Sequence, residues 1–337
     1  MLAKRPRVLV IAAALCIVCS GTLPSRAQVV RLPPVDAAEP YPYPGRLVSY
    51  PDSTAEVLQA PGELSLPKEP ERPPDAREGM FQKLIFTGEW LPGGGSDRFG
   101  VGSVELKSVL ALPIPSREYP LIVTPGFAVH YLDGPISRDL PPRLYDAYAQ
   151  FRWMRRLSPR LGIDLAITPG VFSDFEQGDA DAFRITGHGA AMWTAGPDFK
   201  IVLGAAYIDR FSTDVLPIAG FIWTPHEDVE FELVFPNPRI ARRIDSAGAC
   251  TDDVQDWLYV AGEFGGGIWS VQRASGAADV VDYTDWRIFL GLQRKAIGRL
   301  DRHVEIGYVF AREIRYAGAT PDLEPNDTVM LRGGVTY

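Results

Sequence analysis

The stretch His303–Tyr316 has the sequence HVEIGYVFAREIRY, in which two kinds of residue alternate. From Val304 to Phe310, every second residue is apolar, and the residues between them are mostly polar or small. The apolar set consists of Val304, Ile306, Tyr308 and Phe310. Successive side chains of a β-strand point to opposite faces, so this period of two predicts a strand with one apolar face.

The same alternation recurs from about Phe81 to the C-terminus. Clear examples are residues 160–167, 228–235 and 285–293. Gly, Pro and Asp cluster between these segments, which is typical of turns, and no stretch has a convincing helical period. Residues 80–337 are therefore predicted to form an all-β structure.

Charged residues and glycines occur in the middle of the polar faces. This favours a closed antiparallel transmembrane barrel over a soluble sandwich, because a barrel lumen can hold water. If the alternation continues through each strand, a set of charged side chains points inward and lines the lumen. The set consists of Lys107, Arg152, Arg184, Arg287, Arg332, Glu105, Asp146, Asp164, Glu230, Glu232 and Glu305. Their signs nearly balance, so they either line a water-filled channel or pair across a narrow lumen and close it.

Aromatic residues mark several strand ends. Trp153, Trp193 and Trp223 each end a predicted strand, and a short turn follows each one. Indole rings favour the membrane–water boundary, so we expect an aromatic girdle on the side of the short turns, with Tyr337 as a further member. The alternating segment 329–337 ends on that tyrosine. Such an ending is typical of barrels that the bacterial assembly machinery recognises through the C-terminal strand.

Thirteen segments have the strand pattern, whereas bacterial single-chain barrels use even numbers of strands. The short turn near residue 297 falls on the wrong side of the barrel, so a segment between residues 229 and 294 is misassigned. Splitting residues 256–271 at their three consecutive glycines gives fourteen strands, and merging or losing a segment gives twelve. The chain length suits twelve strands of ~10 residues with their loops. We therefore expect twelve strands, with fourteen as the alternative.

The N-terminus has the layout of a secretory signal peptide, with basic residues before an apolar run. The run Val8–Val18 is too short for a transmembrane helix. Small residues at positions 25 and 27 predict cleavage after Ala27. We expect export by the Sec pathway, with the cell outer membrane as the destination.

The predicted barrel follows a proline-rich segment. Residues 28–79 hold eleven of the thirty prolines, which disfavour both helix and inner strand. We expect residues 1–27 to be the signal peptide, residues 28–79 to be a disordered periplasmic segment and residues 80–337 to be the barrel.

Composition excludes several functions. Removal of residues 1–27 takes away four basic residues and no acidic one, which moves the formal charge from −8 to −12. A polyanion is a poor partner for nucleic acid, so none is expected. Cys250 is the one cysteine left after cleavage, so the fold does not depend on an internal disulfide.

The sequence contains no motif for a cofactor or a metal, so neither is predicted. A lipid hydrolase needs a serine and a histidine that a third polar group orients. Ser173, Asp174 and His188 are available, but nothing places them near one another. We therefore predict no catalytic residue and no enzyme.

Several motifs of this chain occur in the order found in an uncharacterised family of bacterial outer-membrane β-barrel proteins. The family is a porin-like domain of unknown function, and the chain resembles it over roughly residues 81–337. The motifs are LPPRLYD (140–146), TPG (168–170) with SDF (173–175), RITG (184–187), LVFPNPRI (233–240) and AGEFGGGIW (261–269). The resemblance implies a barrel in the outer membrane and brings no activity.

Three functions remain open at this stage. The barrel is a channel for small solutes or ions, a closed structural barrel without transport, or, as the weakest of the three, a lipid hydrolase embedded in the membrane. The expected partners are outer-membrane lipid and the barrel assembly machinery, and the oligomeric state stays open.

Overall fold

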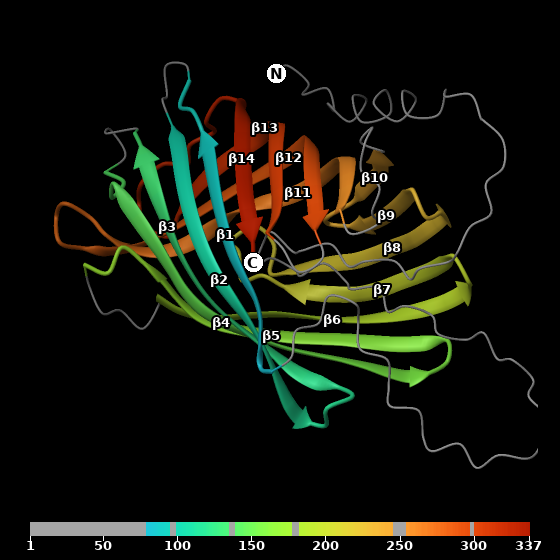
Figure 1. Ribbon diagram of the computed structural model, residues 1–337. Coiled ribbons are helices and arrows are strands. Elements are labelled where there is room, and N and C mark those ends of the chain that lie inside the picture. Colours follow the sequence, from blue (N-terminus) through green and yellow to red (C-terminus); the bar gives the residue numbers. More distant parts are fainter. Residues whose placement is uncertain (1–78, 95–98, 135–138, 177–181, 245–253, 297–299) are drawn as a thin grey trace, which may run out of the picture. The chain divides into compact units, whose positions relative to one another are not determined.

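A computed structural model describes residues 79–94, 99–134, 139–176, 182–244, 254–296 and 300–337 (Figure 1). The predicted signal peptide and residues 28–78 of the predicted proline-rich segment lie outside the described residues. The described residues contain no helix that is long and apolar enough to cross a membrane. They form fourteen antiparallel strands in one closed ring, which confirms the predicted fold class.

The strands follow one another around the ring in chain order. They are β1 (Phe81–Leu91), β2 (Gly100–Pro115), β3 (Pro120–Asp133), β4 (Arg143–Ser158), β5 (Leu161–Ser173), β6 (Phe183–Gly196), β7 (Phe199–Tyr207), β8 (Val215–His226), β9 (Val229–Phe235), β10 (Arg239–Ile244), β11 (Val254–Gln272), β12 (Ala278–Ala296), β13 (Asp301–Tyr316) and β14 (Thr328–Thr336). The first and last strands pair from Ile85 with Thr336 to Trp90 with Leu331, which closes the ring.

The expected count of twelve strands is wrong, and the alternative of fourteen is confirmed. The misassigned segment is residues 229–240, which contains both β9 and β10. Pro236 and Pro238 lack a backbone donor, and the Asn237 amide donates to the Val234 carbonyl at 3.0 Å, so the chain reverses there. The three glycines at 265–267 do not split β11, because each keeps its partner on β12.

With fourteen strands, the turns of two residues all fall on one side. The turns at residues 159–160, 197–198 and 227–228 share an end of the barrel with the start of β1 and the end of β14. We call this the short-turn end. The opposite end carries the β1–β2, β3–β4, β5–β6, β7–β8 and β13–β14 connections, and we call it the long-loop end.

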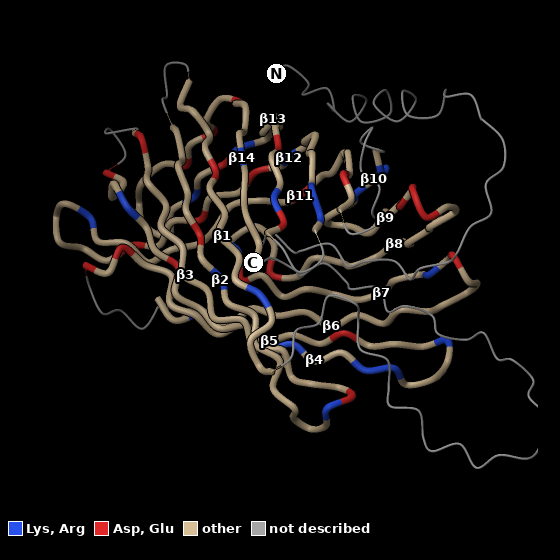
Figure 2. The backbone as a smooth tube through the Cα atoms, in the orientation of Figure 1, with Lys and Arg blue, Asp and Glu red and all other residues tan. Residues whose placement is uncertain are grey.

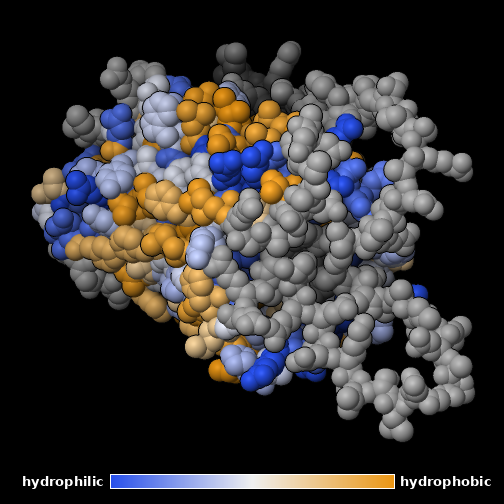
Figure 3. All heavy atoms as spheres, in the orientation of Figure 1, coloured by the Kyte–Doolittle hydropathy of each residue, from blue (hydrophilic) through white to orange (hydrophobic). Residues whose placement is uncertain are grey.

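The outer face of the wall is apolar. Large side chains that alternate with buried ones are strongly exposed, with Leu203 at 61% and Val304 at 67%. Apolar patches cover β1–β3 on the face seen in Figure 3. In Figure 2, β7 and β8 run with almost no charge between their ends. This alternation is what a wall between lipid and a packed interior requires.

Candidate functional site: a filled lumen

The longest strands, β11 and β12, extend past the short strand β10 toward the long-loop end. The pairing of β10 with β11 ends at Arg239 and Ala261, whereas β11 continues to Gln272. Farther along, β11 pairs in parallel with β5, at Ser270 and Ser173. Strands β5 and β11 are not neighbours in the ring, so this contact pinches the barrel.

The burial of side chains along β12 changes between the two ends of the strand. Near the short-turn end, β12 alternates, with Leu290 and Leu292 exposed and their neighbours buried. Farther up, all five residues from Val281 to Asp285 are buried, so both faces of the strand are covered. We call residues 264–287 the upper hairpin. Its β12 part stays paired with β13 as far as Val281 and Tyr316, whereas its β11 part has no partner on β10 and reaches β5 instead.

Two contacts hold the upper hairpin in place from outside its own strands. The Asp174 amide donates to the Ser270 carbonyl at 3.2 Å, and the Gln272 amide donates to Asp174 Oδ2 at 2.7 Å. On the other side, Arg210 from the β7–β8 loop donates to Asp282 Oδ1 at 3.0 Å. These bonds satisfy polar groups that would otherwise be buried without partners.

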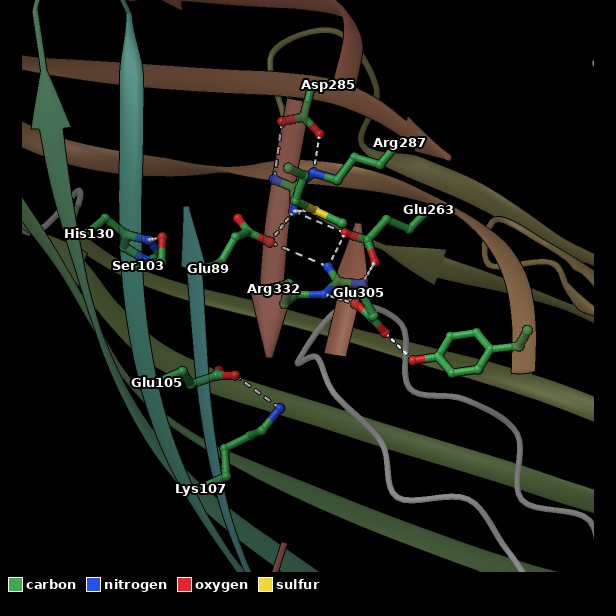
Figure 4. Close-up of polar contacts among 12 residues, drawn as sticks. Glu89, Ser103, Glu105, Lys107, His130, Glu263, Asp285, Arg287, Glu305 and Arg332 are labelled. Carbon is green, nitrogen blue, oxygen red and sulfur yellow. Dashed lines mark hydrogen bonds and ion pairs between the residues drawn. The ribbon is translucent and has the colours of Figure 1, made fainter. Parts of the chain in front are cut away.

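A cluster of buried charges spans five neighbouring strands of the ring, from β11 through β12, β13 and β14 to β1 (Figure 4). We call it the central charge cluster; it consists of Glu89, Glu263, Asp285, Arg287, Glu305 and Arg332. Arg287 Nη1 lies 2.7 Å from Glu89 Oε2 on β1 and 3.0 Å from Glu263 Oε1 on β11. Arg287 Nε lies 2.7 Å from Asp285 Oδ1. One guanidinium thus links three carboxylates on three strands.

Arg332 on β14 is the second hub of this cluster. Its side chain is 0% exposed, and its Nη1 lies 2.9 Å from Glu263 Oε1. It also pairs with Glu305, which accepts a hydrogen bond from the Tyr259 hydroxyl. The guanidinium lies 4.5 Å from the centre of the Phe289 ring. Buried charges are tolerated only when paired in this way, so the cluster is a fixed part of the interior.

Apolar side chains fill the lumen between the central charge cluster and the long-loop end. The Phe99 and Tyr283 rings meet edge to face at 5.2 Å. The core here combines residues of the upper hairpin with residues of the walls. It includes Leu91, Phe99, Val101, Leu144, Phe172, Trp269, Val271, Val281, Tyr283, Ile314 and Leu323. These side chains form one continuous buried cluster in this half of the interior.

Closer to the short-turn end, the predicted inward residues form separate pairs. Lys107 Nζ lies 3.1 Å from Glu105 Oε2 on the same strand. Arg152 donates to both oxygens of Asp164, at 2.9 and 2.7 Å. His188 Nε2 lies 3.5 Å from Asp164 Oδ2.

The remaining predicted lumen residues have other surroundings. Arg184 pairs with Asp209 at 2.7 Å near the long-loop end. Glu230 pairs with Arg239 at 3.3 Å, and Glu232 is buried. Their lining of a lumen stays a proposal.

The sequence analysis missed Glu89, Glu263 and Arg239. The polar face of the segment 82–90 would have included Glu89. Arg239 follows the unrecognised turn, so its face could not be assigned.

The predicted girdle residues lie close to the short-turn end. Trp193 and Trp223 are 54% and 42% exposed, and Tyr337 is 57% exposed. The Trp223 ring stacks on Phe231 at 5.2 Å. Trp153 is half-buried, and the Arg155 guanidinium lies 5.9 Å from the centre of its ring. Their contact with a membrane boundary stays a proposal.

The serine, acid and histidine considered for hydrolysis have other neighbours. Ser173 and Asp174 support the β5–β11 contact, and His188 lies beside Asp164. A different trio is brought together on the inner face. Ser103 Oγ lies 2.8 Å from His130 Nδ1, and His130 Nε2 lies 3.0 Å from Asp146.

Residues 136–320, more than half of the chain, match the family model described as Domain of unknown function (DUF6268). The chain belongs to this family. The sequence of this DUF6268 protein has no detectable similarity to any curated protein.

Solved structures with similar folds include outer-membrane proteins. A NanC porin is 10% identical, with 75% of this chain and 98% of that chain covered and a TM-score of 0.37. A bacterial polysaccharide outer membrane secretin is 11% identical, with 76% and 97% covered and a TM-score of 0.37. An outer membrane channel from Pseudomonas putida F1 is 10% identical, with 82% and 100% covered and a TM-score of 0.37. Scores this low add nothing to the architecture that the strand pairing of the DUF6268 protein defines.

Proposed function

We propose that this DUF6268 protein is an outer-membrane β-barrel whose lumen is closed at rest by its own upper hairpin. The single observation that carries the proposal is the burial of Val281–Asp285 on both faces. A strand that is part of an open channel wall keeps one face toward lipid and one toward water. Here both faces are packed, and the central charge cluster ties the hairpin to β1 and β14.

The outer surface supports a location in a membrane. Exposed aliphatic side chains occupy the middle of the outer face, and the exposed indoles of Trp193 and Trp223 lie close to the short-turn end. We propose that outer-membrane lipid surrounds this band and that the short-turn end faces the periplasm. The sequence features of a signal peptide and an aromatic C-terminal strand favour the same destination and engagement of the barrel assembly machinery.

Conductance across a planar lipid bilayer tests the closed lumen. The wild-type protein is compared with a variant that lacks residues 268–282, which joins the paired neighbours Gly267 and Tyr283. Circular dichroism and a heat-dependent gel shift confirm that each protein is folded and inserted. We expect no stepwise current from the wild type, and sustained steps from wild-type protein would overturn the proposal.

A gated solute channel is the second candidate. The observation in its favour is the set of paired charges below the central charge cluster, where Lys107 meets Glu105 and Arg152 meets Asp164. Such pairs would line a polar path once the upper hairpin moves away. Current in the deletion variant would support this candidate. If Arg184→Ala or Glu305→Ala then alters the ion selectivity of the deletion variant, the substituted residue lines the conducting path. If the deletion variant inserts into the bilayer but carries no current, the result favours a structural barrel without transport.

A further inference from the structure

Three successive strands bring a serine, a histidine and an aspartate together on the inner face. Ser103 on β2 lies directly opposite His130 on β3 in the strand register. Asp146 on β4 lies opposite Ala128, two residues from His130, so it is a diagonal neighbour of the histidine. Side chains two residues apart share one face of a sheet, so all three are on the same side of the wall.

Hydrogen bonds connect the three side chains in a chain. His130 Nε2 lies 3.0 Å from Asp146 Oδ2, and a carboxylate can only accept. Nε2 therefore carries the ring proton, which leaves Nδ1 with a free lone pair. Ser103 Oγ lies 2.8 Å from Nδ1, so the serine hydroxyl donates to a base. A serine–histidine–acid chain raises the nucleophilicity of the serine, and here the two ring nitrogens have exchanged the roles they play in serine proteases.

The upper hairpin contacts Asp146, the last residue in this series of hydrogen bonds. Trp269 Nε1 donates to the other oxygen of Asp146 at 2.6 Å. The rings of Trp269 and His130 meet edge to face, with their centres 5.3 Å apart. Asp146 is buried, so both of its oxygens keep fixed partners. The histidine is thereby oriented before any substrate binds.

A small apolar cavity adjoins the histidine. Its volume is about 20 Å³, which is room for one water-sized group. The lining other than His130 is apolar or aromatic and includes Val101, Leu144, Trp269, Tyr283 and Ile314. Ser103 is not part of this lining, so a group held in the cavity would contact the histidine rather than the serine.

We infer that Ser103 is a nucleophilic serine that accepts an acyl group from an ester, with His130 as its base. Ser103 Oγ bonds to the ester carbonyl carbon while its proton passes to His130 Nδ1. The bond to the leaving alkoxide then breaks, and the alkoxide takes that proton and departs as an alcohol. Water attacks the acyl-serine with His130 again as the base, which releases a carboxylic acid and restores Ser103. The net reaction is ester plus water to acid plus alcohol.

Asp146 and Trp269 act through His130 and are positioning residues. The Asp146 carboxylate sets the tautomer of the imidazole and stabilises the imidazolium that forms. The Trp269 indole holds that carboxylate. Since Trp269 belongs to the upper hairpin, the inference also predicts that the reactive serine requires the hairpin in its closed position.

The first test is covalent labelling of the full-length protein in detergent with a fluorophosphonate probe, with the modified peptide identified by mass spectrometry. We expect the label on Ser103 and none after Ser103→Ala, which removes a single oxygen atom. Ser173→Ala is the matched control, because Ser173 is a serine of the barrel strands whose hydroxyl lies beside an aspartate rather than a histidine. Heat-dependent gel shifts confirm that each variant is folded.

The second test is the rate of labelling and of p-nitrophenyl acetate hydrolysis. Loss of the base in His130→Ala should lower both rates by about 100-fold or more. Trp269→Phe keeps an aromatic ring but removes the N–H donor to Asp146. It should shift the pH profile of labelling and lower the labelling rate less than His130→Ala does. Label on another residue, or a labelling rate unchanged in folded His130→Ala, would overturn the inference. Neither result bears on conductance, so the closed lumen is tested separately.

Discussion

Arg287 Nη1 on β12 lies 2.7 Å from Glu89 Oε2 on β1, so the upper hairpin is joined to a strand that lies beyond β13 and β14 in the ring. The same guanidinium contacts Glu263 and Asp285, and all of these side chains are at most 12% exposed. Charges so far from water hold their positions only while each keeps a partner of opposite sign.

Arg287→Ala should therefore destabilise the barrel strongly. It leaves three buried carboxylates without a shared partner, and breaking a buried pair on one side costs about 3–5 kcal/mol. Urea unfolding in detergent micelles, followed by intrinsic fluorescence, measures the change. The matched control is Arg294→Ala, whose guanidinium is 41% exposed and pairs with Asp256 near the short-turn end. We expect little change there, and equal shifts in the two variants would contradict the role of the central charge cluster.

The contact between β5 and β11 should be trapped by a disulfide. Ser173 and Ser270 are paired residues of the two strands, at a separation that a disulfide can span. In a Cys250→Ser background, Ser173→Cys with Ser270→Cys should cross-link under oxidation and change mobility on a non-reducing gel. Ser173→Cys with Ser275→Cys, which lies in the β11–β12 turn, is the control that should not cross-link. Failure of the first pair to react would mean that the barrel is not pinched at this point.

Gly266 should be the most sensitive glycine of the upper hairpin. Its φ of +100° is strained for any L side chain, and an added Cβ would collide with the Tyr283 carbonyl. Gly266→Ala should reduce stability by about 1–3 kcal/mol, measured by the same urea titration. Gly196→Ala is the control, because nothing lies within 4 Å of its added Cβ. A tolerated alanine at position 266 would contradict the tight approach of β11 and β12.

A positive charge in the middle of the outer face should oppose membrane insertion. Leu203 lies in the middle of β7 and is 61% exposed, whereas Leu300 is 48% exposed in the connection before β13. Arginine at the mid-depth of a barrel wall costs about 2–4 kcal/mol, and the cost falls toward the interfaces. Leu203→Arg should therefore lower the yield of folding into lipid vesicles, while Leu300→Arg should not. Equal yields would indicate that β7 does not contact lipid.

The sequence by itself determined the strands and their two faces. The alternation of Val304, Ile306 and Tyr308 with polar neighbours is a local property, because successive side chains of an extended chain point to opposite sides. It predicted the barrel and the inward direction of Glu305 and Arg332 without any knowledge of strand neighbours. It assigned the count of strands wrongly, because β9 and β10 have only seven and six residues, and together with their turn they are no longer than the single strand β4.

Only the tertiary structure decided what fills the lumen. The inward course of β11 depends on where β10 stops and on a contact between Ser173 and Ser270, which lie on strands far apart in the chain. The meeting of Ser103, His130 and Asp146 depends on the relative register of three strands. Alternation specifies the face of a side chain but not its partner across the barrel, because the partner is set by register and by the closure of the ring.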